Sequence, residues 1–288
     1  MRLGVHCSLK NGLSGALLEA KQKKCEAAQI FTRSPRMWRM SRHSKEEIGK
    51  FRALRKELDI HPLAVHIPYL PNVATSNAIL YAKSVNALIE DLGIAEQIGA
   101  DFLVIHPGAY SENSTPGEGI RKVAGALNAA ISKVEGKCRI LIETVAGGGR
   151  RMGGTFAEIA SMIEGVKDKE RVGVCLDTAH SFAAGYDISK PAGTDRMLAD
   201  FKKMIGLGQL KMLHMNDSMV PCGSQKDRHE HIGKGFIGDG GFQYLIKKLD
   251  KIAEAGILET PKEPEGSDKK NLSLLFKWRK AARGAGTK

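Results

Sequence analysis

Short runs of apolar and β-branched residues alternate along the chain with longer segments whose apolar residues recur at helical spacing. The runs predict eight strands, at Arg2–Cys7, Ala27–Thr32, Pro62–His66, Phe102–His106, Arg139–Glu143, Val172–Asp177, Leu210–His214 and Gly256–Glu259. The clearest helix is predicted from Thr75 to Gly99, with a glycine after its last turn. Further helices are predicted at Leu13–Lys24, Lys45–Leu58, Gly117–Val134, Thr155–Val166, Asp195–Ile205 and Phe242–Ala253.

Strands that alternate with helices imply parallel strands joined by right-handed crossovers. Eight such units favour a closed (β/α)₈ TIM barrel, and a doubly wound open sheet is the alternative. The length of 288 residues suits one barrel, which typically needs about 250 residues. No low-complexity linker or strong internal repeat interrupts the pattern, so we expect residues 1–288 to form a single barrel domain.

Composition narrows the class of protein. The net charge of +12 favours a polyanionic partner such as nucleic acid or an anionic membrane surface, although a protein can also be merely basic. No apolar run approaches the roughly 20 residues that cross a bilayer, and no signal peptide precedes the first strand. The five cysteines are widely spaced. We therefore expect an intracellular, cytoplasmic protein with reduced thiols and no membrane partner.

Six consecutive predicted strands each end at a His, Asp or Glu, and in a barrel these ends share the face where barrel enzymes keep their active site. The nine candidate metal ligands at or just beyond these ends are His66, His106, Glu143, Asp177, His180, His214, Asp227, His229 and Glu259. Any one of them alone is more often a cap or turn residue. Four carboxylates around one mouth repel one another unless cations intervene.

Nine ligands are too many for one tetrahedral ion, so we predict a three-metal cluster with at least one bridging carboxylate. The mixture of imidazole and carboxylate suits Zn²⁺, and would also admit Mn²⁺ or Fe²⁺. Such clusters suit phosphoester hydrolysis.

Three loops beside this face are candidate substrate contacts. Residues 33–45 carry four arginines interleaved with Met37 and Trp38, which can grip phosphate or wedge between bases, or can form a solvated basic loop. Tyr69 and Leu70 follow His66 and are a second candidate wedge, or a proline-stiffened turn. Residues 147–154 combine five glycines with two arginines, a nonspecific phosphate-binding pattern.

With these motifs in place, the sequence resembles the endonuclease IV family of abasic-site endonucleases. The matching segments run in order along nearly the whole chain, at Gln29–Trp38, His66–Leu70, His106–Gly108, Leu176–Asp187, His214–Ser218, Asp227–Gly235 and Leu258–Pro261. The resemblance implies a TIM barrel and cleavage 5′ to abasic sites, leaving a 3′-hydroxyl and a 5′-deoxyribose phosphate. Action on 3′-blocking groups and a monomeric state are further expectations.

The resemblance also implies roles for individual residues. One zinc would be held by His66, His106 and Glu143, a second by Asp177, His214 and Glu259 with Glu143 as the bridge, and a third by His180, Asp227 and His229. Glu143 would position the hydroxide nucleophile and is the catalytic residue. Arg36, Tyr69 and Leu70 match residues that family members insert into duplex DNA at the lesion, where the abasic nucleotide is flipped out.

The chain departs from the family pattern at Ala109-Tyr110, Thr144, Ala179 and Asn11-Gly12, none of which is a candidate ligand. Two other classes of protein remain as alternatives. A metal-dependent sugar isomerase or epimerase on the same type of barrel would need about two metals and no DNA-wedging loop. A non-catalytic DNA-binding module would be expected to have lost some of the ligands.

Overall fold

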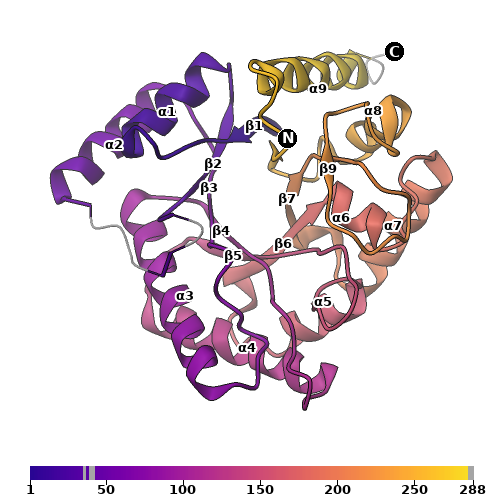
Figure 1. The fold of residues 1–288 in the computed structure, drawn as a ribbon. Coiled ribbons are helices and arrows are strands. Elements are labelled where there is room, and N and C mark those ends of the chain that lie inside the picture. The colour runs from indigo at the N-terminus through magenta and orange to yellow at the C-terminus, as the bar shows by residue number, and fades with distance from the viewer. Residues whose placement is uncertain (35–36, 39–42, 285–288) are drawn as a thin grey trace.

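Eight parallel strands close into a barrel at the centre of the molecule (Figure 1). The structure is a computed structural model that describes residues 1–34, 37–38 and 43–284. The barrel strands are β1 (Arg2–His6), β2 (Ala27–Phe31), β3 (Leu63–His66), β4 (Phe102–Ile105), β5 (Arg139–Glu143), β6 (Val172–Asp177), β7 (Leu210–His214) and β10 (Ala255–Leu258). Each strand pairs with its neighbours in sequence, and β1 closes the barrel against β10. The predicted TIM barrel is confirmed, and the doubly wound alternative is wrong.

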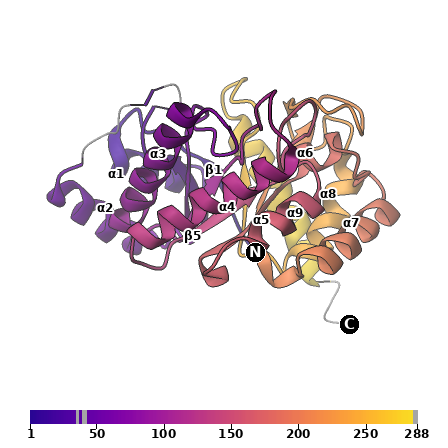
Figure 2. The same ribbon diagram turned by 90° about the horizontal axis from the view of Figure 1, so that it is seen from below.

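Helices cover the outside of the barrel. The α-helices among the described residues are α1 (Gly12–Gln22), α2 (Lys45–Glu57), α3 (Ala78–Ile98), α4 (Pro116–Lys133), α5 (Phe156–Glu164), α6 (Thr178–Ala183), α7 (Pro191–Met204), α8 (Gly238–Leu249) and α9 (Ser267–Gly284). Successive helices pack on one another, as α3, α4 and α5 show in Figure 2. Local sequence defines their ends: Thr115 and Glu118 form a capping box at α4, and Gly99 ends α3 in a left-handed conformation.

The inside of the barrel is filled by one small apolar cluster to which most of the strands contribute. Its members are Ala27, Ala64, Phe102, Val104, Leu141, Cys175, Met212, Ala255 and Ile257. Alanine on some strands leaves room for phenylalanine or methionine on others, as the packed interior of an eight-stranded barrel requires. Gly4 is needed for a different reason, since a Cβ there would lie 1.8 Å from the carbonyl oxygen of Ala27.

Several elements were not predicted. The C-terminal helix α9 lies beside β1 and the N-terminus (Figure 1), where Arg279 donates a hydrogen bond to the Met1 carbonyl oxygen. The short helix α6 follows β6 directly, and β8 (Asp217–Ser218) pairs antiparallel with β9 (His229–Glu230) inside the loop after β7.

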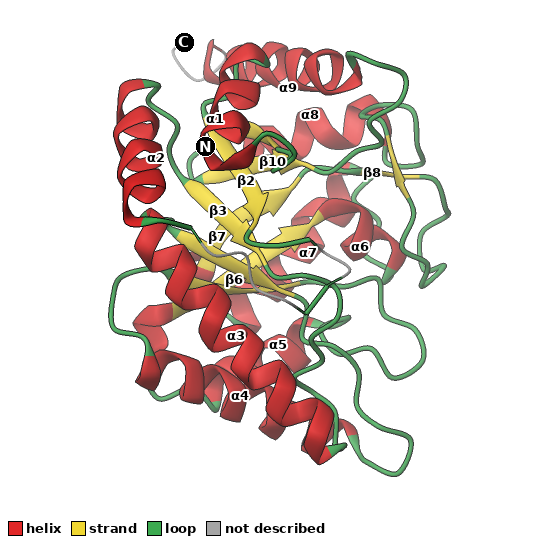
Figure 3. Ribbon diagram, turned by 60° about the vertical axis from the view of Figure 1, so that its left-hand side comes forward, coloured by secondary structure: helices red, strands yellow, loops and turns green. Residues whose placement is uncertain are grey.

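The carboxyl ends of the barrel strands meet at one mouth, because all eight strands run in parallel. Figure 3 shows long loops gathered on one side of the barrel, with β8 among them. All five cysteines are free thiols. Among the described helices, none combines the length and the apolarity that spanning a membrane would require.

Candidate metal centre

Glu143, the last residue of β5, is fully buried and lies at the centre of the mouth. Its Oε2 atom is 3.0 Å from Nε2 of His66 and 3.1 Å from Nε2 of His106. Its Oε1 atom is 2.9 Å from Nδ1 of His214 and 3.4 Å from Nδ1 of His180. Imidazoles from four different elements therefore surround one carboxylate, as expected of a group that bridges ions.

Strand ends and the structures that follow them position the other candidate ligands. His66, Asp177 and His214 are the last residues of β3, β6 and β7. Asp177 also caps α6: its Oδ1 accepts a hydrogen bond of 2.7 Å from the backbone N–H of His180. This cap turns the chain so that His180, three residues later, faces the same centre as the strand ends.

The structure brings eight of the nine predicted ligands together in three overlapping groups. In two groups the ligand atoms lie within 4.8 Å of one another and match the predicted sets: His66, His106 and Glu143, and then Glu143, Asp177, His214 and Glu259. The third group contains Asp177, His180 and His229. Asp227, the predicted third member of that set, has its Oδ1 atom 3.2 Å from His180 Nε2 and 3.3 Å from His229 Nε2.

Backbone carbonyl groups orient three of the imidazoles. Nδ1 of His66 lies 2.6 Å from the Ile67 oxygen, Nδ1 of His180 lies 2.8 Å from the Thr144 oxygen, and Nδ1 of His229 lies 3.2 Å from the Glu259 oxygen. Nδ1 must carry the proton to donate these bonds, so Nε2 is left with a lone pair directed at the centre. Contacts of this kind fix the tautomer and the ring orientation of metal-binding histidines.

The charges of the site favour bound cations. Burial alone would raise the pKa of Glu143, but positive charge on His214 and His106 holds that pKa well below its ordinary value. Burial would lower the pKa of His180, but the negative charge of Asp177 and the proximity of Asp227 raise it well above its ordinary value. The carboxylates are thus stable as anions only opposite positive charge, which divalent ions supply while leaving the imidazoles neutral.

Two buried imidazole nitrogens without a hydrogen-bond partner also indicate a site for cations. Nε2 of His180 and Nε2 of His229 are buried and have no hydrogen-bond partner among the described residues, although both face Asp227. Buried polar atoms are nearly always satisfied, so each of these needs an explanation. Nitrogen and oxygen donors arranged around a shared centre fit Zn²⁺, Mn²⁺ or Fe²⁺.

Two residues that support the centre were missed by the sequence reasoning. Gln29 lies fully buried in β2; its Oε1 accepts from Nε2 of His214 at 2.9 Å, and its Nε2 donates to Oε1 of Glu259 at 2.6 Å. Asn216 donates to Oδ2 of Asp177 at 2.7 Å and accepts from the Glu259 N–H at 2.8 Å. A glutamine in the middle of the apolar run Ala27–Phe31 was the available signal, because a buried amide must find partners.

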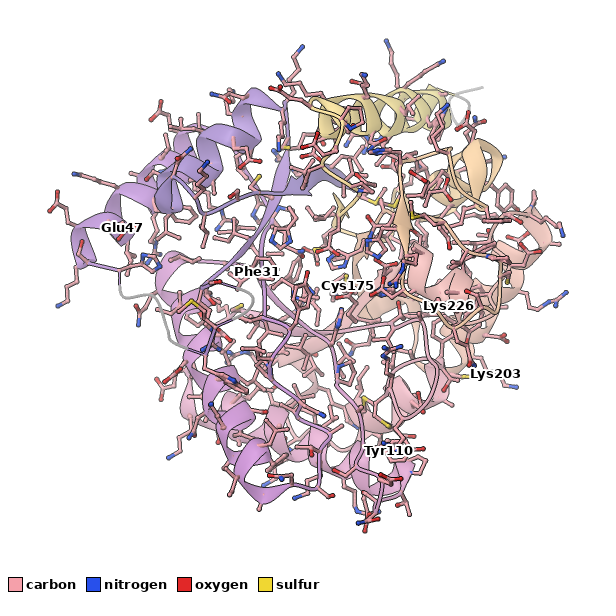
Figure 4. All side chains as sticks on the ribbon, in the orientation of Figure 1. Phe31, Glu47, Tyr110, Cys175, Lys203 and Lys226 are labelled. Carbon is pink, nitrogen blue, oxygen red and sulfur yellow. The ribbon has the colours of Figure 1, made fainter. Side chains whose placement is uncertain are left out.

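At the rim of the mouth, Tyr69 is 67% exposed and Leu70 is half-buried. The Tyr69 ring lies 5.9 Å from the ring of Phe31, which Figure 4 shows near the middle of the barrel, and 6.4 Å from that of His66. Both wedge candidates therefore stand beside the centre. Arg36, the third, lies outside the residues that the structure describes.

The interpretation of the basic loop needs one correction. Arg33 is buried, not free to contact a phosphate, and its Nη2 lies 2.5 Å from Oδ2 of the equally buried Asp91. This pair joins the end of β2 to α3, which sequence alone does not reveal. Met37 is exposed, and Lys83 packs over the Trp38 ring at 4.2 Å. The loop's other three arginines lie outside the described residues.

Comparison with known proteins gives a family match for this chain and relatives that cover most of its length. Residues 17–281 match the family model described as xylose isomerase-like TIM barrel. A protein of Halothermothrix orenii named probable endonuclease 4 is 42% identical over 262 residues, which cover 91% of this chain and 94% of the relative.

Solved structures agree with this match. Endonuclease IV from Thermus thermophilus superimposes with a TM-score of 0.86 at 35% identity, over 98% of this chain and all of that one. A D-tagatose 3-epimerase-like protein also superimposes, with a TM-score of 0.75 over the full length of both chains. Its identity is only 17%, so that likeness shows the fold alone.

Proposed function

Because this chain belongs to the endonuclease IV family, we propose that it is a DNA base excision repair enzyme that hydrolyses the phosphodiester 5′ to abasic sites. Its relatives are endonucleases, which implies that this chain is a nuclease with DNA as its substrate. The observation that carries the finer proposal is the convergence of nine His, Asp and Glu side chains on one barrel mouth around Glu143. Cleavage would leave a 3′-hydroxyl and a 5′-deoxyribose phosphate, and 3′-blocking groups would be removed at the same site.

The residues at the mouth fit three zinc ions, one of which Mn²⁺ or Fe²⁺ could replace. His66 and His106 would hold the first, Asp177, His214 and Glu259 the second, and His180, Asp227 and His229 the third, with Glu143 shared. When bound, such ions supply Lewis acidity that activates water and stabilises negative charge on the phosphodiester. Glu143 is suited to be the shared ligand, since Oε2 faces His66 and His106 while Oε1 faces His214 and His180.

The surroundings of the centre suit a distorted DNA strand. The net charge of +12 attracts the phosphate backbone. Tyr69 and Leu70, with Arg36, would fill the gap left when the abasic nucleotide leaves the stack, because unstacking costs least at a damaged site. We propose that residues 1–288 act as one catalytic domain and as a monomer.

The test is a nicking assay on a duplex with one abasic site, paired with elemental analysis of the purified protein. We expect cleavage on the 5′ side of the lesion, about three divalent ions per chain, and loss of cleavage after chelation. Glu57→Gln, which changes an exposed glutamate at the far end of α2, is the matched control for Glu143→Gln. A metal-loaded protein that leaves the abasic duplex intact would overturn the proposal.

The same preparation tests the two alternatives. Interconversion of aldose and ketose sugars without nicking would identify a sugar isomerase or epimerase. Binding of the abasic duplex without nicking by fully loaded protein would identify a non-catalytic DNA-binding module.

A further inference from the structure

The loop of residues 147–154, which follows β5, carries two adjacent arginines whose side chains have different surroundings. Its backbone is tied to the loop after β4. Arg151 forms a bridge with Ala109, Tyr110 N–H donates to the Arg150 oxygen at 3.1 Å, and Met152 N–H donates to the Gly108 oxygen at 2.9 Å. Tyr110, labelled in Figure 4, marks that neighbouring loop. The position of Arg151 is therefore set by main-chain hydrogen bonds and not by its own side chain.

Two glycines allow this loop to sit between its neighbours. Gly148 has a φ of +85°, and a Cβ there would lie 3.1 Å from the Gln225 oxygen, two residues before Asp227. Gly153 has a φ of +95°, and a Cβ there would lie 3.2 Å from Pro107. The loop is thus held between the segment after β4 and the segment that carries Asp227, both of which border the candidate metal centre.

Only one of the two arginines lines the cavity beside the candidate metal centre. Arg151 lines a cavity of about 430 Å³ together with His66, His106 and Asp227, whereas Arg150 does not line it. The Arg151 side chain is exposed, and its guanidinium group forms no hydrogen bond or ion pair with any described residue. Asp227, the carboxylate that shares the cavity, faces His180 and His229 instead.

We propose that Arg151 binds a non-bridging phosphate oxygen of the DNA strand that enters this cavity, next to the bond that is cut. The inference rests on the proposed function and adds a substrate-binding residue to it. A guanidinium group matches phosphate with two parallel hydrogen bonds, and both are strengthened by charge. A guanidinium group that lines this cavity and has no protein anion of its own is complementary to the charge of a backbone phosphate.

The position in the cavity makes the contact selective for damaged DNA. We expect a regular duplex to stay outside the mouth, where any exposed arginine can attract a phosphate at long range. We expect a strand to enter the cavity when it is distorted towards the candidate metal centre, as at an abasic site. Arg151 then contributes to the preference for the lesion, while Arg150 contributes only to general attraction.

Four proteins test this: wild type, Arg151→Ala, Arg151→Lys and the matched control Arg150→Ala. Each is loaded with metal and titrated, with fluorescence anisotropy as the readout, into two duplexes. One carries an abasic analogue with a cleavage-resistant phosphorothioate linkage, and the other is intact. Elemental analysis and a thermal melt of each protein report the metal centre and the fold.

We expect Arg151→Ala to weaken binding to the abasic duplex about tenfold, as loss of a charge-assisted phosphate contact should. The dependence of its log affinity on log salt should flatten by about 0.9 for the one lost contact. Arg151→Lys should recover part of the loss, because lysine keeps the charge without the fork. Arg150→Ala should stay within about twofold of wild type on the abasic duplex, and the two alanine variants should behave alike on intact DNA.

Equal effects of Arg151→Ala and Arg150→Ala on the abasic duplex would overturn the inference, because they would make Arg151 one surface charge among many. Loss of metal in Arg151→Ala would also overturn it, by assigning the residue to the support of the centre. A wild-type protein that shows no preference for the abasic duplex would instead overturn the proposed function, and this inference with it. A wild-type preference that is undiminished in Arg151→Ala removes the inference alone.

Discussion

Gln29 offers a test of the candidate metal centre through a residue that is not itself a proposed ligand. Its amide group is buried in β2 and joins three partners: Oε1 accepts from His214 at 2.9 Å, and Nε2 contacts Oε1 of Glu259 at 2.6 Å and Nδ1 of His6 at 2.9 Å. Replacing it with leucine keeps a similar volume and removes every one of these hydrogen bonds. His214 then loses the contact that holds its proton on Nε2 and leaves Nδ1 for the centre.

The magnitude follows from the groups left unpaired. Removing the amide costs about 1–3 kcal/mol at His214, whose Nε2 loses its partner, and less at Glu259, whose Oε1 keeps a contact of 3.2 Å with Nδ1 of His6. The more apolar side chain of leucine offsets about 1–2 kcal/mol of this. We therefore expect the free energy of unfolding of metal-free Gln29→Leu to fall by up to about 3 kcal/mol. Metal affinity should fall by about 10- to 100-fold, which is typical when the outer contacts of metal ligands are removed.

Two measurements read these effects separately. Urea unfolding of metal-free protein gives the change in stability, and competition with a chelator of known affinity gives the change in metal binding. Gln97→Leu, at an exposed position of α3, is the control for the substitution itself. Gln29→Glu keeps an acceptor for His214 but places a second carboxylate against Glu259, so it should lose affinity through repulsion. Metal affinity of Gln29→Leu within about twofold of wild type would refute the role given to Gln29.

Three further outcomes are expected. Glu143→Gln should lower the rate of abasic-site cleavage more than about tenfold and reduce bound metal without unfolding the barrel, because the shared negative charge is lost; a variant that keeps over a tenth of the wild-type rate would contradict this. Tyr69→Ala should weaken binding to abasic duplex about tenfold but leave hydrolysis of a small phosphodiester and metal content unchanged, since wedging offsets only the cost of unstacking; an equal loss on both substrates would place Tyr69 in the support of the centre. Burial alone would raise the pKa of Glu26, but hydrogen bonds from Arg279 and the Leu3 N–H hold that pKa below its ordinary value of 4.5. Ionised Glu26 therefore stabilises the fold above about pH 4.5 and ceases to do so as the pH falls through its folded-state pKa. Glu26→Gln should flatten the acid side of the plot of unfolding free energy against pH, and an unchanged slope would refute the assignment.

Much of the fold could be predicted from local pattern, because strands and helices leave periodic traces over a few residues. All eight barrel strands lie within one or two residues of the predicted ranges. Helix α9 was missed because its sequence is mostly polar and buries only a narrow face that includes Leu272, Leu275 and Trp278. The short helix α6 was missed because its six residues, which include His180, are too few to show a period.

The candidate site, like the fold, could be predicted from the sequence only in part. Residue types at strand ends are visible in the sequence, and parallel strands bring their ends to one face, so the convergence of the nine candidate ligands was predictable. Their assignment to individual zinc ions came from family resemblance and stays a prediction.

The sequence by itself determined which chemistry the barrel mouth holds, because strand order and residue type depend only on the chain. Only the tertiary structure decided how that chemistry is presented. It shows that Arg33 is neutralised by Asp91 while Arg151 faces the cavity unpaired, and that Gln29 orients His214. These contacts depend on how different elements pack against one another. Local periodicity in the sequence does not indicate which residues of distant elements will meet.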